Sequence, residues 1–192
     1  MKKLPVVLLS LCLLAVLAVS CAKDESSATN LTGATDAILV QITEGAAALV
    51  EENRIPVTFT DGITKDNSQS ILYVSADDFE ANVEDAYAES ALMSVAHRVA
   101  LIKCKDAASA KKISDLIAGN FNSGWMICVT PDSSWTLVSG QYVLLVVSKD
   151  DYADAALQSF EELAGKDNVK SEKFYTIGDA LPEGDGGGLL LG

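Results

Sequence analysis

Histidine is nearly absent from this chain, which carries a single one, His97, in 192 residues. Basic residues are also scarce, because 14 Lys and Arg stand against 27 Asp and Glu, for a formal net charge of −13. A nucleic-acid interface needs a basic surface, so this balance excludes nucleic acid as a partner. His97 has no Cys or carboxylate at metal-ligand spacing, and we expect it to lie partly exposed at the start of a strand.

Motifs of common enzyme classes are missing as well. The sequence contains no GxGxxG, P-loop, HExxH or GxSxG pattern. Ser109 and Lys112 match the SxxK pattern of penicillin-binding serine enzymes, but the partner motifs SDN and KTG are absent, so we interpret them as exposed helix surface. Asp150, Asp151 and Asp154 lack the ligand spacing of an EF-hand loop, and helix capping and solvation explain them as well as calcium does. We expect no cofactor, no metal and no enzymatic activity.

The N-terminus has the three regions of an export signal. The basic pair Lys2 and Lys3 precedes an apolar run over residues 6–19, which is shorter than the roughly 18 residues of a membrane-spanning helix. Small residues directly before Cys21 resemble the bacterial lipobox, in which the Cys is acylated and the signal is cut before it. We predict a lipoprotein signal peptide over residues 1–20 and lipid attachment at Cys21. The alternatives are an ordinary signal peptide or an uncleaved anchor helix.

Processing at Cys21 leaves an acidic module that is anchored to a membrane by lipid. Removal of residues 1–20 takes away two positive charges, so the net charge changes from −13 to −15. Residues 21–33 are rich in Ser, Thr, Asn and charge, and we predict a flexible tether. Anionic lipid repels an acidic domain, which should project outward. We therefore expect an extracytoplasmic protein of the cell membrane or envelope with a protein or peptide partner.

The remaining chain predicts a single α+β domain over residues 34–180. Apolar residues three and four apart indicate an N-terminal helix over 34–52. Two strand pairs are predicted, over 85–93 with 96–104 and over 135–138 with 141–147, and a helix follows each pair. Ser75 is expected to cap a short helix over 76–83. Residues 57–70 indicate a short extended piece and a loop, and residues 174–177 either pack or add an edge strand.

The two strand–strand–helix segments align at an offset of 44 residues. RVALIKCKD (98–106) aligns with YVLLVVSKD (142–150), and in each copy the final Asp is expected to cap the following helix. A duplicated ββα unit predicts a four-stranded antiparallel sheet with two helices on one face. Coincidence is the alternative, because strand–turn–helix is a common local pattern. Residues 181–192 form a Gly-rich tail predicted to be disordered, with a docking role for Leu189–Leu191 as the alternative.

Three segments of the domain carry a family resemblance: VALIKCKD (99–106), AKKI (110–113) and GQYVLLVVS (140–148) with its following helix. Together, over about residues 75–163, they resemble an uncharacterised family of bacterial lipoproteins, domain-of-unknown-function family 4358. The resemblance implies an exported, lipid-anchored α+β domain. It supplies no activity and no functional residues.

Two cysteines and three aromatic residues are the remaining candidates for a site. Cys12 leaves with the signal, so Cys104 and Cys128 can form a disulfide outside the cytoplasm, or they are two separately buried apolar residues. Trp125, Trp135 and Tyr142 are candidates to line a ligand groove near the hairpin, although aromatic residues on a sheet are more often core. We favour a non-catalytic binding or interaction module. The alternative is an extracytoplasmic thiol-redox or other enzyme that uses the two cysteines.

Overall fold

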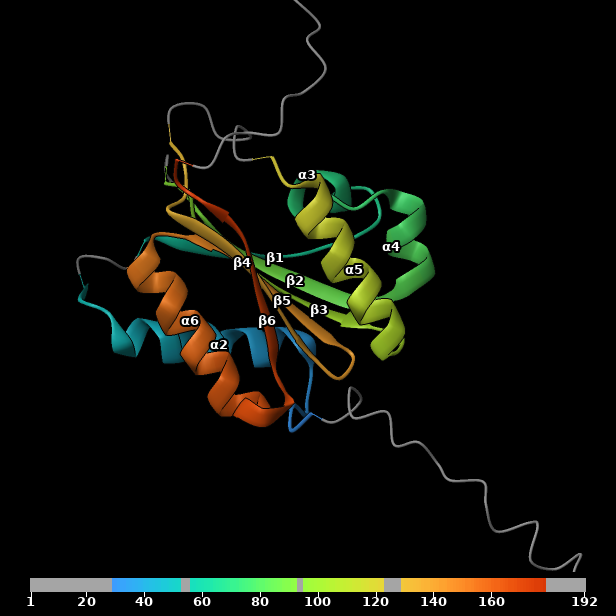
Figure 1. Ribbon diagram of the computed structural model, residues 1–192, viewed down its shortest axis with the longest axis horizontal. Coiled ribbons are helices and arrows are strands. Elements are labelled where there is room, and N and C mark those ends of the chain that lie inside the picture. The colour runs from blue at the N-terminus through green and yellow to red at the C-terminus, as the bar shows by residue number, and fades with distance from the viewer. Residues whose placement is uncertain (1–28, 53–55, 93–94, 123–128, 179–192) are drawn as a thin grey trace, which may run out of the picture.

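The computed structural model describes residues 29–52, 56–92, 95–122 and 129–178 (Figure 1). The predicted signal peptide, Cys21, Trp125, Cys128 and the Gly-rich tail lie outside these residues. The described elements are α2 (Thr35–Leu49), β1 (Thr58–Gly62), α3 (Ser68–Leu72), α4 (Ala76–Asn82), β2 (Val83–Ala91), β3 (Arg98–Cys104), α5 (Ala107–Asn120), β4 (Ser133–Ser139), β5 (Tyr142–Ser148), α6 (Asp150–Ala164), the 3-10 helix η3 (Lys166–Asn168) and β6 (Lys170–Thr176). None of the helices among these residues is long and apolar enough to span a bilayer.

The fold is α+β, as predicted, but the prediction of four strands is wrong. The sheet has six antiparallel strands in the order β1-β2-β3-β5-β4-β6. The four predicted strands form its centre, and β1 and β6 extend it at the two edges. Edge strands are exposed, so their sequences lack the apolar runs of central strands. Four of the seven residues of β6 are exposed. The edge strand offered as one alternative over residues 174–177 is therefore present, but its polar start at Lys170 was not predicted.

Helices cover both faces of the sheet (Figure 1): α2 and α6 pack on one face, and α3, α4 and α5 lie on the other. The prediction of two helices on one face is therefore wrong. The reason lies in the central strands, because all seven residues of β5 are buried and they alternate between the two helix layers. A strand buried on both faces has a near-continuous apolar sequence, and the run VLLVV (143–147) is of this kind.

The sequence repeat is not a repeat in three dimensions. β3 and β5 are neighbours that run antiparallel, and their hairpin partners β2 and β4 lie on opposite sides of them. The following helices α5 and α6 lie on opposite faces, so the aligned residues Val99 and Val143 also point to opposite faces. Three directions are thus reversed between the copies: the direction of the second strand, the side on which its hairpin partner lies, and the face that the following helix covers. A rotation cannot reverse all three, so the two ββα units have opposite hands and cannot be superimposed.

Helix capping agrees with the sequence at two of the three predicted positions. The side chains of Ser75 and Asp106 accept hydrogen bonds from backbone amides three residues on, which confirms both caps. Asp150 is instead the first residue of α6, and its own backbone amide donates to the carboxylate of Asp132 at 3.4 Å. The predicted second cap is wrong because a side chain from the loop before β4 takes that place.

The domain has two distinct ends along the strand direction. We call the end at which the described chain begins the near end, and the opposite one the far end. At the near end, the first described residues lie beside the end of α6, where the amide of Asn30 donates to the carbonyl of Ala164 at 3.1 Å. Leu31, which we predicted to belong to the tether, is buried there. At the far end, the amide of Ile177 donates to the carbonyl of Asp132. The described chain therefore begins and finishes at opposite ends of the sheet (Figure 1).

Candidate functional site

The predicted aromatic groove does not bring its two described members together. Trp135 and Tyr142 point to the same face, but the cross-strand pair Leu137 and Leu144 separates them. Tyr142 is buried in the core, whereas Trp135 is half-buried and its ring lies 5.2 Å from the amine of Lys173. Both side chains therefore stabilise the fold at separate places. Trp125 lies outside the described residues.

Cys104 is completely buried beneath α5, and it forms no disulfide with any described residue. Burial raises the pKa of this thiol to about 12, and the nearby Asp106 carboxylate adds to the shift. Thiol–disulfide chemistry needs an accessible thiolate, so the environment of Cys104 is unsuited to a redox role. Cys128 lies outside the described residues, and the disulfide stays a prediction.

The expectation that His97 is partly exposed is wrong, since only 1% of the residue is exposed. Its Nδ1 atom lies 2.9 Å from the Oγ of Ser148, and its Nε2 atom lies 3.8 Å from a carboxylate oxygen of Glu89. The ring of Tyr152 packs edge-on against the imidazole with 4.6 Å between ring centroids. These partners come from three other elements, at sequence separations of up to 55 residues, so local sequence contains no signal for this cluster.

The order Ser148–His97–Glu89 resembles that of a catalytic triad, but its serine is buried. Only 3% of Ser148 and 1% of His97 are exposed, so the serine hydroxyl is buried, although His97 lines one pocket. An acyl-transfer site also needs amide donors for the oxyanion, and the amide of Asp150, shortly after the serine, is directed at Asp132. The cluster therefore fixes the start of α6 to the sheet.

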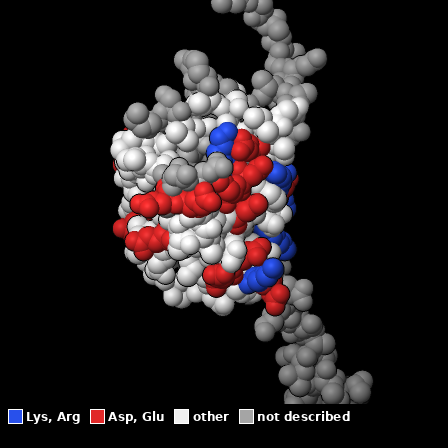
Figure 2. All heavy atoms as spheres, turned by 90° about the vertical axis from the view of Figure 1, so that its left-hand side faces the viewer, with Lys and Arg blue, Asp and Glu red and all other residues white. Residues whose placement is uncertain are grey.

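The outer layer of α2 and α6 is strongly acidic. These helices contain no Lys or Arg and carry seven acidic residues, namely Asp36, Glu44, Asp150, Asp151, Asp154, Glu161 and Glu162. Figure 2 shows a band of acidic side chains across this side of the molecule. No group of three or more metal-ligating side chains occurs within the described residues. The carboxylates of these two helices make this surface negatively charged.

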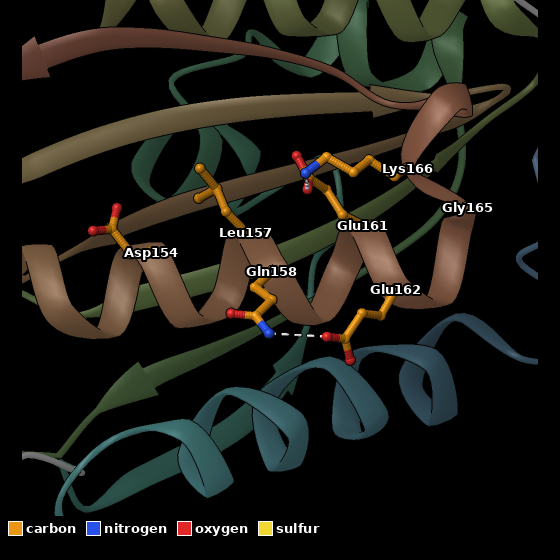
Figure 3. Close-up of a pocket in the computed structure, with 7 residues that line it drawn as sticks. All are labelled: Asp154, Leu157, Gln158, Glu161, Glu162, Gly165 and Lys166. Carbon is orange, nitrogen blue, oxygen red and sulfur yellow. Dashed lines mark hydrogen bonds and ion pairs between the residues drawn. The ribbon is translucent and has the colours of Figure 1, made fainter.

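A hollow on the outside of α6 lies in this acidic layer (Figure 3). Gln158 donates to Glu162 at 2.9 Å, and Lys166 pairs with Glu161 at 3.6 Å. These polar side chains therefore contact one another along the helix surface instead of converging on a common point (Figure 3). The hollow lacks the converging polar groups of an active site.

Large apolar side chains are exposed at the far end, around β1. Four of them form what we call the far-end patch, with exposed fractions of 68% for Val57, 45% for Phe59, 59% for Leu92 and 37% for Val95. The amide of Leu92 donates to the carbonyl of Val57 at 2.9 Å, and Phe59 and Val95 line one pocket. Exposed apolar groups that cluster in this way are typical of interaction surfaces.

A pocket of about 320 Å³ lies beside this patch, between β1, β2, the start of β3 and α3. Its wall includes Phe59, Ile71 and Ala88, together with the polar residues Asp61 and Arg98. The guanidinium of Arg98 is buried and donates to the carbonyls of Ser70 and Ile71, which holds α3 against the sheet. Burial lowers the pKa of Arg98 below its ordinary value. The short extended piece predicted within residues 57–70 corresponds to β1, but neither the pocket nor the patch was predicted from the sequence.

Comparisons of the chain with protein-family models, with curated proteins and with solved structures found no match.

Proposed function

We propose that the protein is an exported, lipid-anchored envelope lipoprotein whose domain is a non-catalytic binding module, with the far-end patch as its binding surface. One observation carries the proposal: the chain enters the domain at the near end, while Val57, Phe59, Leu92 and Val95 are exposed at the opposite end. A lipid on Cys21 would hold the near end toward the membrane. The patch would then face outward, where a partner in the envelope can reach it.

The sequence supports the anchored location in two ways. Small residues precede Cys21 after an apolar run of signal-peptide length, and residues 75–163 resemble a family of bacterial lipoproteins. The acidic layer of α2 and α6 supports a domain that stands away from an anionic bilayer. Two acyl chains bury enough CH₂ groups to make such an anchor stable.

The side-chain chemistry supports binding over catalysis. The Ser148–His97 pair and the thiol of Cys104 are both buried, so neither nucleophile meets solvent. The pocket beside the patch instead combines apolar walls with a few polar groups, which is the composition of many recognition sites. We therefore propose that the far end recognises a partner and leaves it chemically unchanged.

Site-specific photo-crosslinking in intact cells tests this proposal. A photoreactive phenylalanine at position 92, in the far-end patch, should capture a defined envelope partner. The same group at position 158, on the exposed outer surface of α6, is the matched control and should capture none. Exchange of residues 1–21 for an ordinary cleavable signal peptide should release the protein from the membrane and abolish the crosslink from position 92. Equal capture from both positions, or turnover of a small molecule by the purified protein, would contradict the proposal.

A further inference from the structure

The outer edge of β1 has backbone groups available for pairing. The amide of Leu92 donates to Val57, and the amide of Ile63 donates to the carbonyl of Ala86 at 2.8 Å. In an antiparallel ladder such bonds recur at every second residue, so Thr58 and Thr60 direct their N–H and C=O groups away from β2. In the part of the chain that the structure describes, no strand pairs with this outer edge.

The available edge ends at Gly62. This residue also faces outward, but the side chain of Asp61 accepts from its amide at 2.8 Å and the side chain of Asn67 donates to its carbonyl at 3.1 Å. The edge thus offers the N–H and C=O groups of Thr58 and Thr60. That is enough for a short stretch of an added strand.

The two edges of the sheet differ in how they are protected. Charged side chains on an edge strand oppose strand addition, and β6 carries Lys170, Glu172 and Lys173 among its seven residues. β1 has Asp61 as its one charged residue, and that carboxylate accepts from the neighbouring amide. Phe59, at the centre of β1, is 45% exposed. The β1 edge is therefore the one suited to accept a strand.

The side chains around β1 indicate what such a strand would carry. On the pocket face, Val57 and Phe59 offer apolar contacts to the alternate residues of a neighbouring strand. On the opposite face, Thr60 pairs with Glu89, whose side chain is 16% exposed, and the acidic helix α2 packs against β2 there. The described residues carry 22 acidic and 10 basic side chains, a net charge of −12, which also favours a basic partner.

We propose that β1 binds an extended strand of a partner protein by β-sheet addition, and that this strand alternates apolar residues on the Phe59 face with basic residues on the Glu89 face. Backbone hydrogen bonds from Thr58 and Thr60 supply affinity, while the pocket and the acidic surroundings supply specificity. This inference rests on the proposed function, because it names the mode of binding and the chemistry of the partner at the same far end.

Peptide binding to the mature chain, produced from residue 22 onward so that it carries neither the signal nor the lipid, tests the inference. The probe is a fluorescent seven-residue peptide of alternating Lys and Val, measured by fluorescence anisotropy. One control has the same composition with Lys and Val in separate blocks, and a second has Glu in place of Lys. The alternating Lys–Val peptide should bind about tenfold more tightly than either control, because only it places the two side-chain types on opposite faces. Equal binding of the Lys–Val isomers would overturn the inference.

Substitutions at Thr60 test the role of the strand edge. Thr60→Pro removes an outward N–H and leaves the bonds to β2 intact, so it should weaken peptide binding about tenfold. Thr60→Val keeps that N–H, and its binding should stay within about twofold of the unchanged protein. Should Thr60→Pro fail to fold, Thr60→Lys keeps the backbone and should weaken binding several-fold by repelling the basic strand. Unchanged binding by folded Thr60→Pro, or by Thr60→Lys, would overturn the inference.

Two further results separate this inference from the proposed function. If the protein forms a dimer that Thr60→Pro dissociates, a second copy occupies the edge and a basic partner strand is wrong. If position 92 still captures an envelope partner in Thr60→Pro cells, the binding module stands while strand addition at β1 is refuted. Loss of that capture in Thr60→Pro but not in Thr60→Val cells supports both.

Discussion

The Nδ1 atom of His97 lies 2.9 Å from the hydroxyl oxygen of Ser148, which ties the start of β3 to the end of β5. Both residues are buried, and they meet where β5 leads into α6. The contact joins residues that are 51 positions apart, so it stabilises the tertiary structure at the far end and not a single local element. A buried hydrogen bond of this kind stabilises mainly because losing one partner leaves the other unsatisfied.

Replacement of this histidine should therefore reduce the free energy of unfolding and should not change the reactivity of Ser148. His97→Leu leaves the Ser148 hydroxyl buried without its partner and should cost about 1–3 kcal/mol in the free energy of unfolding, measured with urea. Adding Ser148→Ala should recover part of that loss, which a double-mutant cycle reports as coupling. A serine-reactive fluorophosphonate probe should not label Ser148. Labelling that His97→Leu abolishes would reveal a catalytic pair instead.

Cys104 should resist alkylation in the folded protein. With its pKa near 12, the thiol at pH 8 is ionised in roughly one molecule in ten thousand, and burial also blocks access. In a chain with Cys21 and Cys128 replaced by Ser, iodoacetamide should modify Cys104 only after urea unfolds the protein, as mass spectrometry would show. Rapid modification of the native form would contradict the buried position.

Two buried tyrosines should respond differently to loss of the hydroxyl. Among the residues that the structure describes, the buried Tyr73 hydroxyl has no hydrogen-bond partner, whereas the Tyr152 hydroxyl donates to the carbonyl of Thr43 at 3.4 Å. At pH 7, Tyr73→Phe should leave the unfolding free energy unchanged or raise it. Tyr152→Phe should lower it by about 0.5–1 kcal/mol. A larger loss for Tyr73→Phe in urea titrations would show that its hydroxyl has a partner.

Tyr73 should also make the protein sensitive to alkali. Burial raises the pKa of Tyr73 to about 12, although Arg98 partly opposes the shift, and the unfolded value is near 10. The folded state holds this proton more tightly than the unfolded state does. The protein therefore keeps its full stability with respect to this group below about pH 10 and loses stability as the pH rises toward 12. Over that range the stability difference between Tyr73→Phe and the unchanged protein should grow by up to about 1.4 kcal/mol per pH unit. Parallel urea-unfolding curves at pH 9 and 11 measure it, and an unchanged difference would refute it.

The two aspartates of the sequence repeat should differ in their effect on stability. Asp106 accepts from the amide of Ser109 at 2.7 Å, and this hydrogen bond lowers the pKa of its carboxyl. Asp106→Ala should lower the midpoint of thermal unfolding by about 3 °C at pH 7. The depressed pKa makes this contribution present above the ordinary carboxyl pKa of about 4, and it should fade as the pH falls below that value. Asp150→Ala should have a smaller effect, because Asp132 serves that helix end. Equal losses would contradict the difference in capping.

Local patterns in the sequence were sufficient for most of the secondary structure. Apolar residues spaced three and four positions apart identified α2, and continuous apolar runs identified β3 and β5. Both features depend only on neighbours along the chain. Caps at Ser75 and Asp106 were also predictable, since each satisfies amides a few residues away. The cap of α6 was not, because Asp132 reaches it from another segment.

The sequence by itself determined α2, α4, α5 and α6, the central strands and the acidic character, since periodicity and charge are properties of the chain alone. Helix α3 was missed, because it begins within residues 57–70, which we predicted to be an extended piece and a loop. Only the tertiary structure decided which face each helix covers, because β3 and β5 are apolar on both faces and either side accepts a helix. It alone also buried His97 against Ser148 and left Phe59 exposed at a sheet edge. Burial depends on what packs above a residue. Distant residues such as Ser148 and Tyr152 cover His97, whereas no described strand pairs with the outer edge beside Phe59.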